Sequence, residues 1–101
     1  MTSQTLRLLA VMLESPANNF YGFALAKSAG LTTGTLYPIL ARLEAARWLA
    51  SEWEKVDAAE AGRPRRRLYR LTGHGMDSGR RALNEHATRL GFGGATPRWS
   101  M

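Results

Sequence analysis

The segment from Leu31 to Trp48 limits the possible folds more than any other part of the chain. Its large apolar residues fall at i, i+3, i+4 and i+7, which predicts one buried face of a helix. They are Leu36, Ile39, Leu40 and Leu43. The opposite face carries Gly34, Pro38, Ala41 and Ala45, with Thr35, Tyr37 and Arg42 at its margins. A helix that enters the DNA major groove needs such a small, polar face, but a helix packed on both faces inside the protein would also fit.

Pro38 restricts where this helix begins, because proline has no backbone N–H and is tolerated best near a first turn. A helix capped by Gly34 or Thr35 would suit Pro38 best. A cap at Thr33 would instead predict a slight irregularity near Pro38.

The size of the chain predicts a single soluble domain. It has 101 residues, and 45% of them are hydrophobic, which is enough for a modest core. There is no cysteine, so disulfide and thiolate chemistry are excluded. No apolar run approaches the roughly 20 residues that span a bilayer, and the N-terminus does not resemble a signal peptide. We therefore expect a cytoplasmic, nucleoid-associated protein without membrane partners.

Positive charge is concentrated in one part of the sequence. The formal net charge is +6 and the pI is about 10.8. Residues 1–48 carry a balance of +2, residues 49–60 carry −3 and residues 61–101 carry +7. Five arginines lie within Arg63–Arg70. A polyanion is the natural partner of such a focused site, and nucleic acid fits better than a membrane surface because no basic amphipathic helix is present.

Two further helices are predicted before the central one. The first has an apolar stripe and a start that Ser3 or Thr5 could cap; the stripe consists of Leu6, Leu9, Ala10 and Leu13. Leu8, Val11 and Met12 widen its apolar surface, which favours either a deeply buried helix or contact with a partner subunit. The second helix is expected over Phe20–Ala29, after Asn19 as its cap, and Gly30 ends it. A short Gly-containing turn then leads into the central helix, as in a helix-turn-helix.

After Ala46 the pattern changes from helical to alternating, which predicts a β-hairpin. The expected strands are Leu49–Val56 and Arg66–Leu71, joined by a loop over Asp57–Pro64. Four of the five residues from Arg63 to Arg67 are arginines. The hairpin could be an ordinary solvated one, but mutual repulsion among these arginines favours binding to something anionic.

The C-terminal part is predicted to form one more helix, capped by Thr72 and running to about Leu90. Its apolar stripe is expected to pack on a symmetry mate, because two-fold operators are matched by two-fold proteins; the stripe consists of Met76, Leu83, Ala87 and Leu90. Residues 1–90 would then form the domain, with residues 72–90 as its dimerisation helix, and residues 91–101 a flexible tail.

These elements together describe a mainly α fold with a small β-hairpin, in the order α-α-α-β-β-α of a winged helix-turn-helix. The sequence resembles the PadR family of transcriptional regulators from about Phe20 to Leu83, in a short form with a single C-terminal helix. The resemblance rests on Tyr21-Gly22-Phe23, Gly34-Thr35-Leu36-Tyr37-Pro38, Ser51-Glu52-Trp53-Glu54, Gly62-Arg63-Pro64 and Tyr69-Arg70-Leu71-Thr72. Arg47-Trp48 replaces the Gly-Leu turn that is usual in the family, so the exit from the central helix is expected to differ.

The resemblance implies a dimeric repressor whose third helix enters the major groove and whose wing contacts the backbone or minor groove. The residues that it implies for base contacts are Thr33, Thr35, Tyr37 and Arg42. Those implied for backbone and wing contacts are Tyr21, Arg63, Arg65, Arg66 and Arg67. Family members commonly bind effectors near the dimer interface, and whether this short form binds one is open.

No catalytic constellation is evident in the sequence. His74 and His86 are twelve residues apart and lack carboxylate partners at metal-binding spacing, so neither a metal nor a cofactor is expected. Trp48, Trp53 and Tyr69 are expected in the core. The predicted function is sequence-specific binding of double-stranded DNA by a dimeric repressor. The alternatives are a DNA-anchoring adaptor of the plasmid-partition or nucleoid type and, less favoured, a sensor of multiple drugs or phenolic ligands.

Overall fold

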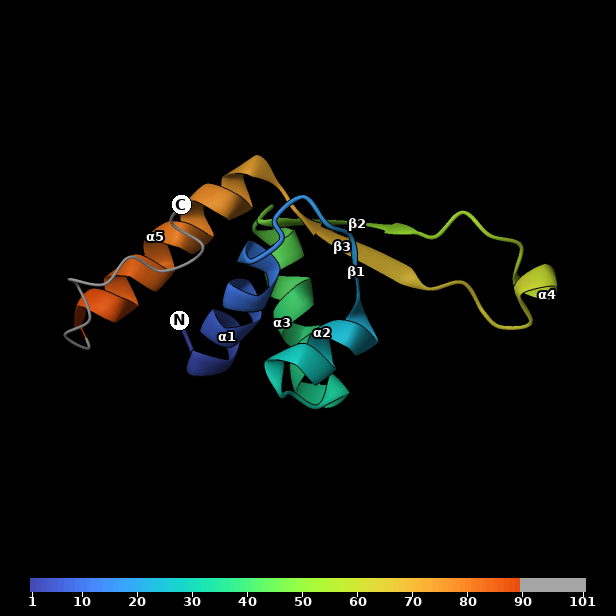
Figure 1. The fold of residues 1–101 in the computed structure, drawn as a ribbon, viewed down its shortest axis with the longest axis horizontal. Coiled ribbons are helices and arrows are strands. Elements are labelled where there is room, and N and C mark those ends of the chain that lie inside the picture. The colour runs from blue at the N-terminus through green and yellow to red at the C-terminus, as the bar shows by residue number, and fades with distance from the viewer. Residues whose placement is uncertain (90–101) are drawn as a thin grey trace.

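The computed structural model describes residues 1–89, which form a mainly helical domain with a three-stranded antiparallel sheet (Figure 1). This arrangement confirms the winged helix-turn-helix predicted from the sequence. The elements are α1 (Ser3–Leu13), β1 (Phe20–Tyr21), α2 (Gly22–Ala29), α3 (Thr33–Ala45), β2 (Leu49–Trp53), α4 (Ala58–Ala61), β3 (Arg67–Leu71) and α5 (Gly73–Arg89). The expected end of the last helix at Leu90 and the expected tail lie outside the described residues. No helix within residues 1–89 is long and apolar enough to span a membrane.

The core lies between α1, α2 and α3. The predicted stripe of α3 is buried as expected, with Leu36 and Leu40 at 0% exposure. On α1, Leu8 and Met12 are also fully buried. Their burial inside the same chain identifies α1 as a core helix, which was one of the two interpretations of its wide apolar surface.

Threonine side chains cap the first and third helices, one to three residues before the positions expected from the sequence. The Thr5 N–H donates to Thr2 Oγ1 at 3.2 Å, and the Thr35 N–H donates to Thr32 Oγ1 at the same distance. Because α3 starts at Thr33, Pro38 lies in its second turn and leaves the Gly34 carbonyl without an intrahelical donor. Both residues are exposed, so water can satisfy that carbonyl.

The prediction that α2 begins at Phe20 is wrong, because Phe20 and Tyr21 form a short strand instead. β1 pairs with β3, which places Phe20 opposite Tyr69 and Tyr21 opposite Leu68. The sheet order is therefore β1-β3-β2, with three strands in place of the expected two. This pairing fixes the start of α2 against the base of the wing.

The wing, which we define as residues 49–71, projects away from the helices (Figure 1). Both of its long strands are shorter than expected: β2 ends at Trp53, and β3 begins at Arg67. The connection expected to be a loop contains the single-turn helix α4, because Asp57 Oδ1 accepts the Ala59 N–H at 2.8 Å and caps it. Gly62, with φ of 68°, ends that turn in the left-handed conformation that glycine adopts readily.

Glu54 holds the base of the wing together. Its carboxylate accepts hydrogen bonds from the Arg63 guanidinium, from the Arg66 N–H at 2.9 Å and from the Tyr21 hydroxyl at 3.3 Å. The Arg63 hydrogen bond is the main reason that the pKa of Glu54 falls from 4.5 to about 2, although burial opposes the fall. One carboxylate thus joins β1, the end of β2 and the returning chain.

The exit from α3 uses arginine in a conformation that usually selects glycine. Arg47 has φ of 64°, its N–H donates to the Glu44 carbonyl at 3.0 Å, and the Trp48 N–H donates to the Leu43 carbonyl at 2.9 Å. This is the Schellman pattern of helix ends. Arg47 thus adopts the left-handed conformation despite the cost to a residue with a Cβ atom.

The start of α5 contacts the residues that follow α3. Thr72 Oγ1 accepts the Gly75 N–H at 2.9 Å, which confirms Thr72 as the cap, and donates to the Arg47 carbonyl at 2.6 Å. Gly75 lies so close to the chain that a Cβ atom there would lie 1.9 Å from the Trp48 carbonyl oxygen. α5 then packs along α1, with Gly79 facing Leu13.

We expect Gly75→Ala to lower the free energy of unfolding by about 2–3 kcal/mol, because the new methyl group overlaps a backbone that cannot move away freely. Gly73→Ala is the matched control, since no atom lies within 4 Å of its Cβ position, and its effect should stay within about 1 kcal/mol. Urea denaturation followed by circular dichroism measures both. Equal stability of the two variants would contradict the close approach of α5 to Trp48.

Glu54→Gln should destabilise the protein in a pH-dependent way. A carboxylate whose pKa is lowered by folding stabilises the native state above its unfolded pKa, and that contribution is lost as the pH falls from about 4.5 towards 2. The difference in unfolding free energy between wild type and Glu54→Gln should therefore be largest above pH 4.5 and shrink at lower pH. Glu52→Gln is the control, because Glu52 is an exposed carboxylate on β2, two residues before Glu54, and it should change stability by no more than about 0.5 kcal/mol. A Glu54→Gln difference that does not vary with pH would refute this role.

Candidate nucleic-acid interface

The outward face of α3 carries small side chains and is exposed along its length; we call it the small face. Gly34, Pro38, Ala41 and Ala45 are all exposed, while the buried stripe faces the core. Of the expected base-contacting residues at the start of the helix, Thr33 is exposed, whereas Thr35 is half-buried and hydrogen-bonded to Thr32. This face has no large side chain that would keep another surface at a distance.

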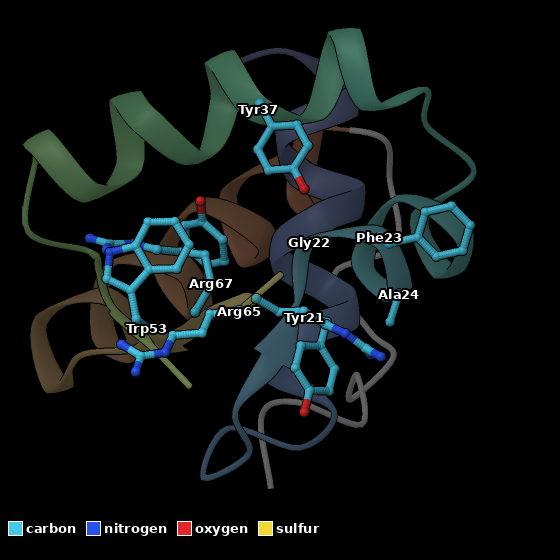
Figure 2. Close-up of a pocket in the computed structure, with 10 residues that line it drawn as sticks. Tyr21, Gly22, Phe23, Ala24, Tyr37, Trp53, Arg65 and Arg67 are labelled. Carbon is cyan, nitrogen blue, oxygen red and sulfur yellow. The ribbon is translucent and has the colours of Figure 1, made fainter. Parts of the chain in front are cut away.

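Tyr37 lies on the margin of this face that is nearest to α2 and the wing. It is 45% exposed, and its ring lies against the start of α2 (Figure 2). A Cβ atom at Gly22 would lie 2.6 Å from the Tyr37 hydroxyl oxygen. Glycine at position 22 therefore allows the tyrosine to lie against the helix backbone.

Arg42 lies on the opposite margin, towards the N-terminus of α1. It lines a shallow hollow together with Met1, Thr2 and Thr5, and its side chain is exposed. Within residues 1–89 no carboxylate lies within ion-pairing distance of it. Tyr37 and Arg42 thus flank the small face of α3 on its two sides.

A groove of about 720 Å³ runs between α2, α3 and the wing (Figure 2). Tyr37 of α3 and Arg65, Arg66 and Arg67 of the wing all line it. Its other lining residues are Tyr21, Gly22, Phe23, Ala24, Trp53 and Tyr69. No acidic residue lines the groove, and its walls combine aromatic rings with guanidinium groups.

Two of the four arginines between positions 63 and 67 are paired with carboxylates of the same chain. Arg63 forms an ion pair with Glu54, and hydrogen bonding to that carboxylate raises the pKa of Arg63. Arg67 lies 4.0 Å from the Glu44 carboxylate, and its Nε donates to Ser51 Oγ at 3.1 Å. Ser51 in turn donates to Glu44 at 2.6 Å, which connects α3 to the wing.

The guanidinium groups of Arg65 and Arg66 have no carboxylate partner within residues 1–89. Arg65 Nε donates to the Val56 carbonyl at 2.8 Å, and the Arg66 guanidinium lies 4.8 Å from the centroid of the Tyr21 ring. The Tyr21 hydroxyl already donates to Glu54. Among the residues expected to contact nucleic acid, Arg65 and Arg66 therefore carry the uncompensated charge of the wing.

Trp53 is exposed, and the expectation that it belongs to the core is wrong. Its side chain is 57% exposed and lines the groove, with the Arg67 guanidinium 5.0 Å from its ring centroid. Tyr69 is buried as expected, and burial raises the pKa of its hydroxyl. Phe23, at 73% exposure, also lines the groove and was not singled out. The exposure of Trp53 follows from its position at the end of β2, where the wing extends beyond the helices.

The structure gives the predicted dimerisation stripe a different environment. Leu83 is 6% exposed and lies in the core of its own chain, so it is unavailable to a second subunit. Met76 is partly buried against the same core, and Ala87 is half-buried. Leu90 lies outside the described residues. α5 therefore packs on α1 of the same chain, where a symmetry mate had been expected.

The residues that could bind a metal do not come together in the part of the chain that the structure describes. Within residues 1–89 no three histidine or acidic side chains are grouped closely enough for a metal ion. His74 instead contacts the Trp48 ring edge-on, with 6.2 Å between ring centroids.

Comparison with known proteins identifies the family. The model of the transcriptional regulator PadR-like family matches residues 8–85. A crystal structure of a PadR family transcriptional regulator from Eggerthella lenta is 31% identical, covers 89% of this chain and 81% of its own, and superimposes with a TM-score of 0.66. No curated protein matches the sequence significantly.

More distant structures share the fold alone. Bordetella bronchiseptica BpsR, whose DNA binding is regulated by 6-hydroxynicotinic acid, is 21% identical over 96% of this chain and 69% of its own, with a TM-score of 0.69. The PcaV regulator from Streptomyces coelicolor is 19% identical over 95% and 64% of the two chains, with the same TM-score. The family match and the Eggerthella lenta structure are the decisive comparisons: this chain belongs to the PadR-like family of transcriptional regulators, which are not enzymes.

Proposed function

We propose that this regulator is a repressor that binds a two-fold operator in double-stranded DNA as a homodimer. The observation that supports this most strongly is the shared groove: Tyr37 of α3 and the arginines of the wing line one surface. α3 enters the major groove with its small face, and the wing lies along the neighbouring backbone or minor groove. As a DNA-binding regulator, the protein would act in the cytoplasm, on the nucleoid.

Base recognition is assigned to the margins of the small face of α3. Arg42 is free of carboxylate partners within residues 1–89 and can donate two hydrogen bonds to one base edge. Thr33 and Thr35 lie at the start of the helix, where side chains reach the groove floor first, and Tyr37 faces the wing side. Repression follows from occupation of the operator.

Affinity is assigned mainly to the wing. The guanidinium groups of Arg65 and Arg66 have no carboxylate partner within residues 1–89, and Arg63 and Arg67 add charge that Glu54 and Glu44 partly balance. The Tyr21 ring packs against the Arg66 guanidinium. Arginine contacts to phosphates release counterions, so affinity falls steeply as the salt concentration rises. The second subunit would be held by α5, through Met76, Ala87 and Leu90, since Leu83 is already buried.

The direct test is selection of bound sequences from a random DNA pool, followed by footprinting. A repressor of this kind enriches a two-fold sequence and protects one or two short sites. Protection that spreads along an extended repeat would instead support a DNA-anchoring adaptor with the same fold. Failure to enrich any sequence would refute sequence-specific recognition.

Arg42→Ala should relax sequence preference. We expect discrimination between the selected operator and a scrambled duplex to fall by about 1–3 kcal/mol, because one base edge loses its donor. Fluorescence anisotropy with both duplexes measures it. An equal loss of affinity on both sequences would show that Arg42 contacts only the backbone.

Arg65→Ala should weaken binding to the operator and the scrambled duplex equally. The slope of log affinity against log salt concentration should fall by about 1, because one phosphate contact is lost. Arg81→Ala is the matched control, since Arg81 is also exposed but lies on α5 in an ion pair with Asp77, and it should bind like the wild type. A loss confined to the operator would contradict the backbone role.

A further inference from the structure

Exposed aromatic side chains gather at the groove between α3 and the wing. Within residues 1–89 four large hydrophobic residues are exposed, and three of them line this groove: Phe23, Tyr37 and Trp53. The fourth is Met1. Exposed apolar groups that cluster in one place indicate a binding surface.

Trp53 is held in place as one wall of the groove. The Arg67 guanidinium lies 5.0 Å from its ring centroid, and Arg67 is itself fixed by a 3.1 Å hydrogen bond to Ser51. Figure 2 shows the indole carried by the wing and the Tyr37 ring carried by α3, and both line the groove. The two rings thus contribute to the groove from two separate elements of the fold.

The chemistry of the groove selects an anionic ligand with apolar surface. Arg65, Arg66 and Arg67 supply positive charge from the wing side, and none of the lining residues is acidic. A free phosphate would use the arginines but not the aromatic rings. A chain of deoxyribose rings joined by phosphates matches both kinds of side chain.

The position of the groove specifies which part of the DNA it meets. The major and minor grooves of B-DNA are separated by one sugar–phosphate strand, so a protein that places α3 in one and its wing beside the other must hold that strand between them. We propose that this groove is the seat of that strand, with Trp53 and Tyr37 packed against deoxyribose rings and Arg65 and Arg66 paired with the adjacent phosphates. The inference rests on the proposed function, because it assumes that α3 and the wing bind one duplex. Trp53 is then a DNA-contacting residue that is independent of base sequence.

The test measures binding of the full-length chain to a labelled random-sequence duplex of about 30 bp at low salt. Trp53→Ala should weaken binding about tenfold, whereas Trp53→Phe should retain most of the affinity because it keeps a ring against the sugar. Val56→Ala is the matched control, since Val56 lies on the same wing but does not line the groove, and it should bind like the wild type. Melting temperatures confirm that each variant is folded.

A second measurement follows Trp53 directly. In the chain with Trp48 and Trp99 replaced by phenylalanine, Trp53 is the only tryptophan left. Adding the duplex should quench its emission and reduce its accessibility to acrylamide, with the same midpoint as the anisotropy change. This readout does not depend on how much affinity any variant loses.

The outcomes separate the inference from the proposed function. If the wild type binds no duplex at low salt, the proposed function itself fails. If the wild type binds but Trp53→Ala binds equally well and the Trp53 emission does not change, only the inference that the groove holds the sugar–phosphate strand fails. A loss confined to unpaired oligonucleotides would also overturn it, because the groove would then take single strands and not the backbone of a duplex.

Discussion

Repulsion among the wing arginines is the constraint on which the arrangement of this surface depends. Four arginines within five residues destabilise any compact turn unless part of their charge is balanced. Two carboxylates of the chain provide that balance: Glu54 pairs with Arg63 and Glu44 lies beside Arg67. From the sequence, an external anion was expected to relieve the repulsion. In the structure, two of the four arginines lie beside carboxylates of the same chain, which leaves Arg65 and Arg66 to act on a partner.

The same two carboxylates also set the geometry of the interface. Glu54 connects β1, β2 and the returning chain, so the wing cannot turn independently of the start of α2. Glu44 belongs to α3 and reaches Ser51 at 2.6 Å, so the wing is also tied to the helix proposed to read the DNA. Charge balance and the orientation of the wing therefore have one physical origin. The groove between α3 and the wing is a consequence of these contacts.

Periodic features of the sequence predicted the fold well. The stripe of α3, the cap of α5, the glycine that ends α2 and the fold class were all correct, because each depends on local spacing and backbone chemistry. The expected Asn19 cap of α2 was wrong, because Tyr21 occupies the cap position and makes no side-chain cap hydrogen bond. β1 was missed because a two-residue strand has no period of its own and exists only by pairing with β3. The left-handed conformation of Arg47 was not predicted, because arginine rarely adopts it and the contact of the Arg47 carbonyl with Thr72 joins residues far apart in the sequence.

The candidate site was only partly predictable for a similar reason. The arginines and the face of α3 stood out by residue type, but whether they meet depends on tertiary structure. Trp53 was expected in the core because tryptophan usually is buried, and its exposure follows from the length of the wing. Leu83 was expected at a subunit interface, but it is buried in the core of its own chain.

The central claim is that α3 and the wing form one surface for a single duplex. Titration of the isotope-labelled protein with duplex DNA, followed by amide chemical shifts, tests it most directly. The account predicts that signals from Thr33–Ala45 and from Arg63–Arg67 change together, with one midpoint, while those of α5 beyond Leu83 change much less. Changes in only one of the two segments, or separate midpoints for the two, would contradict it.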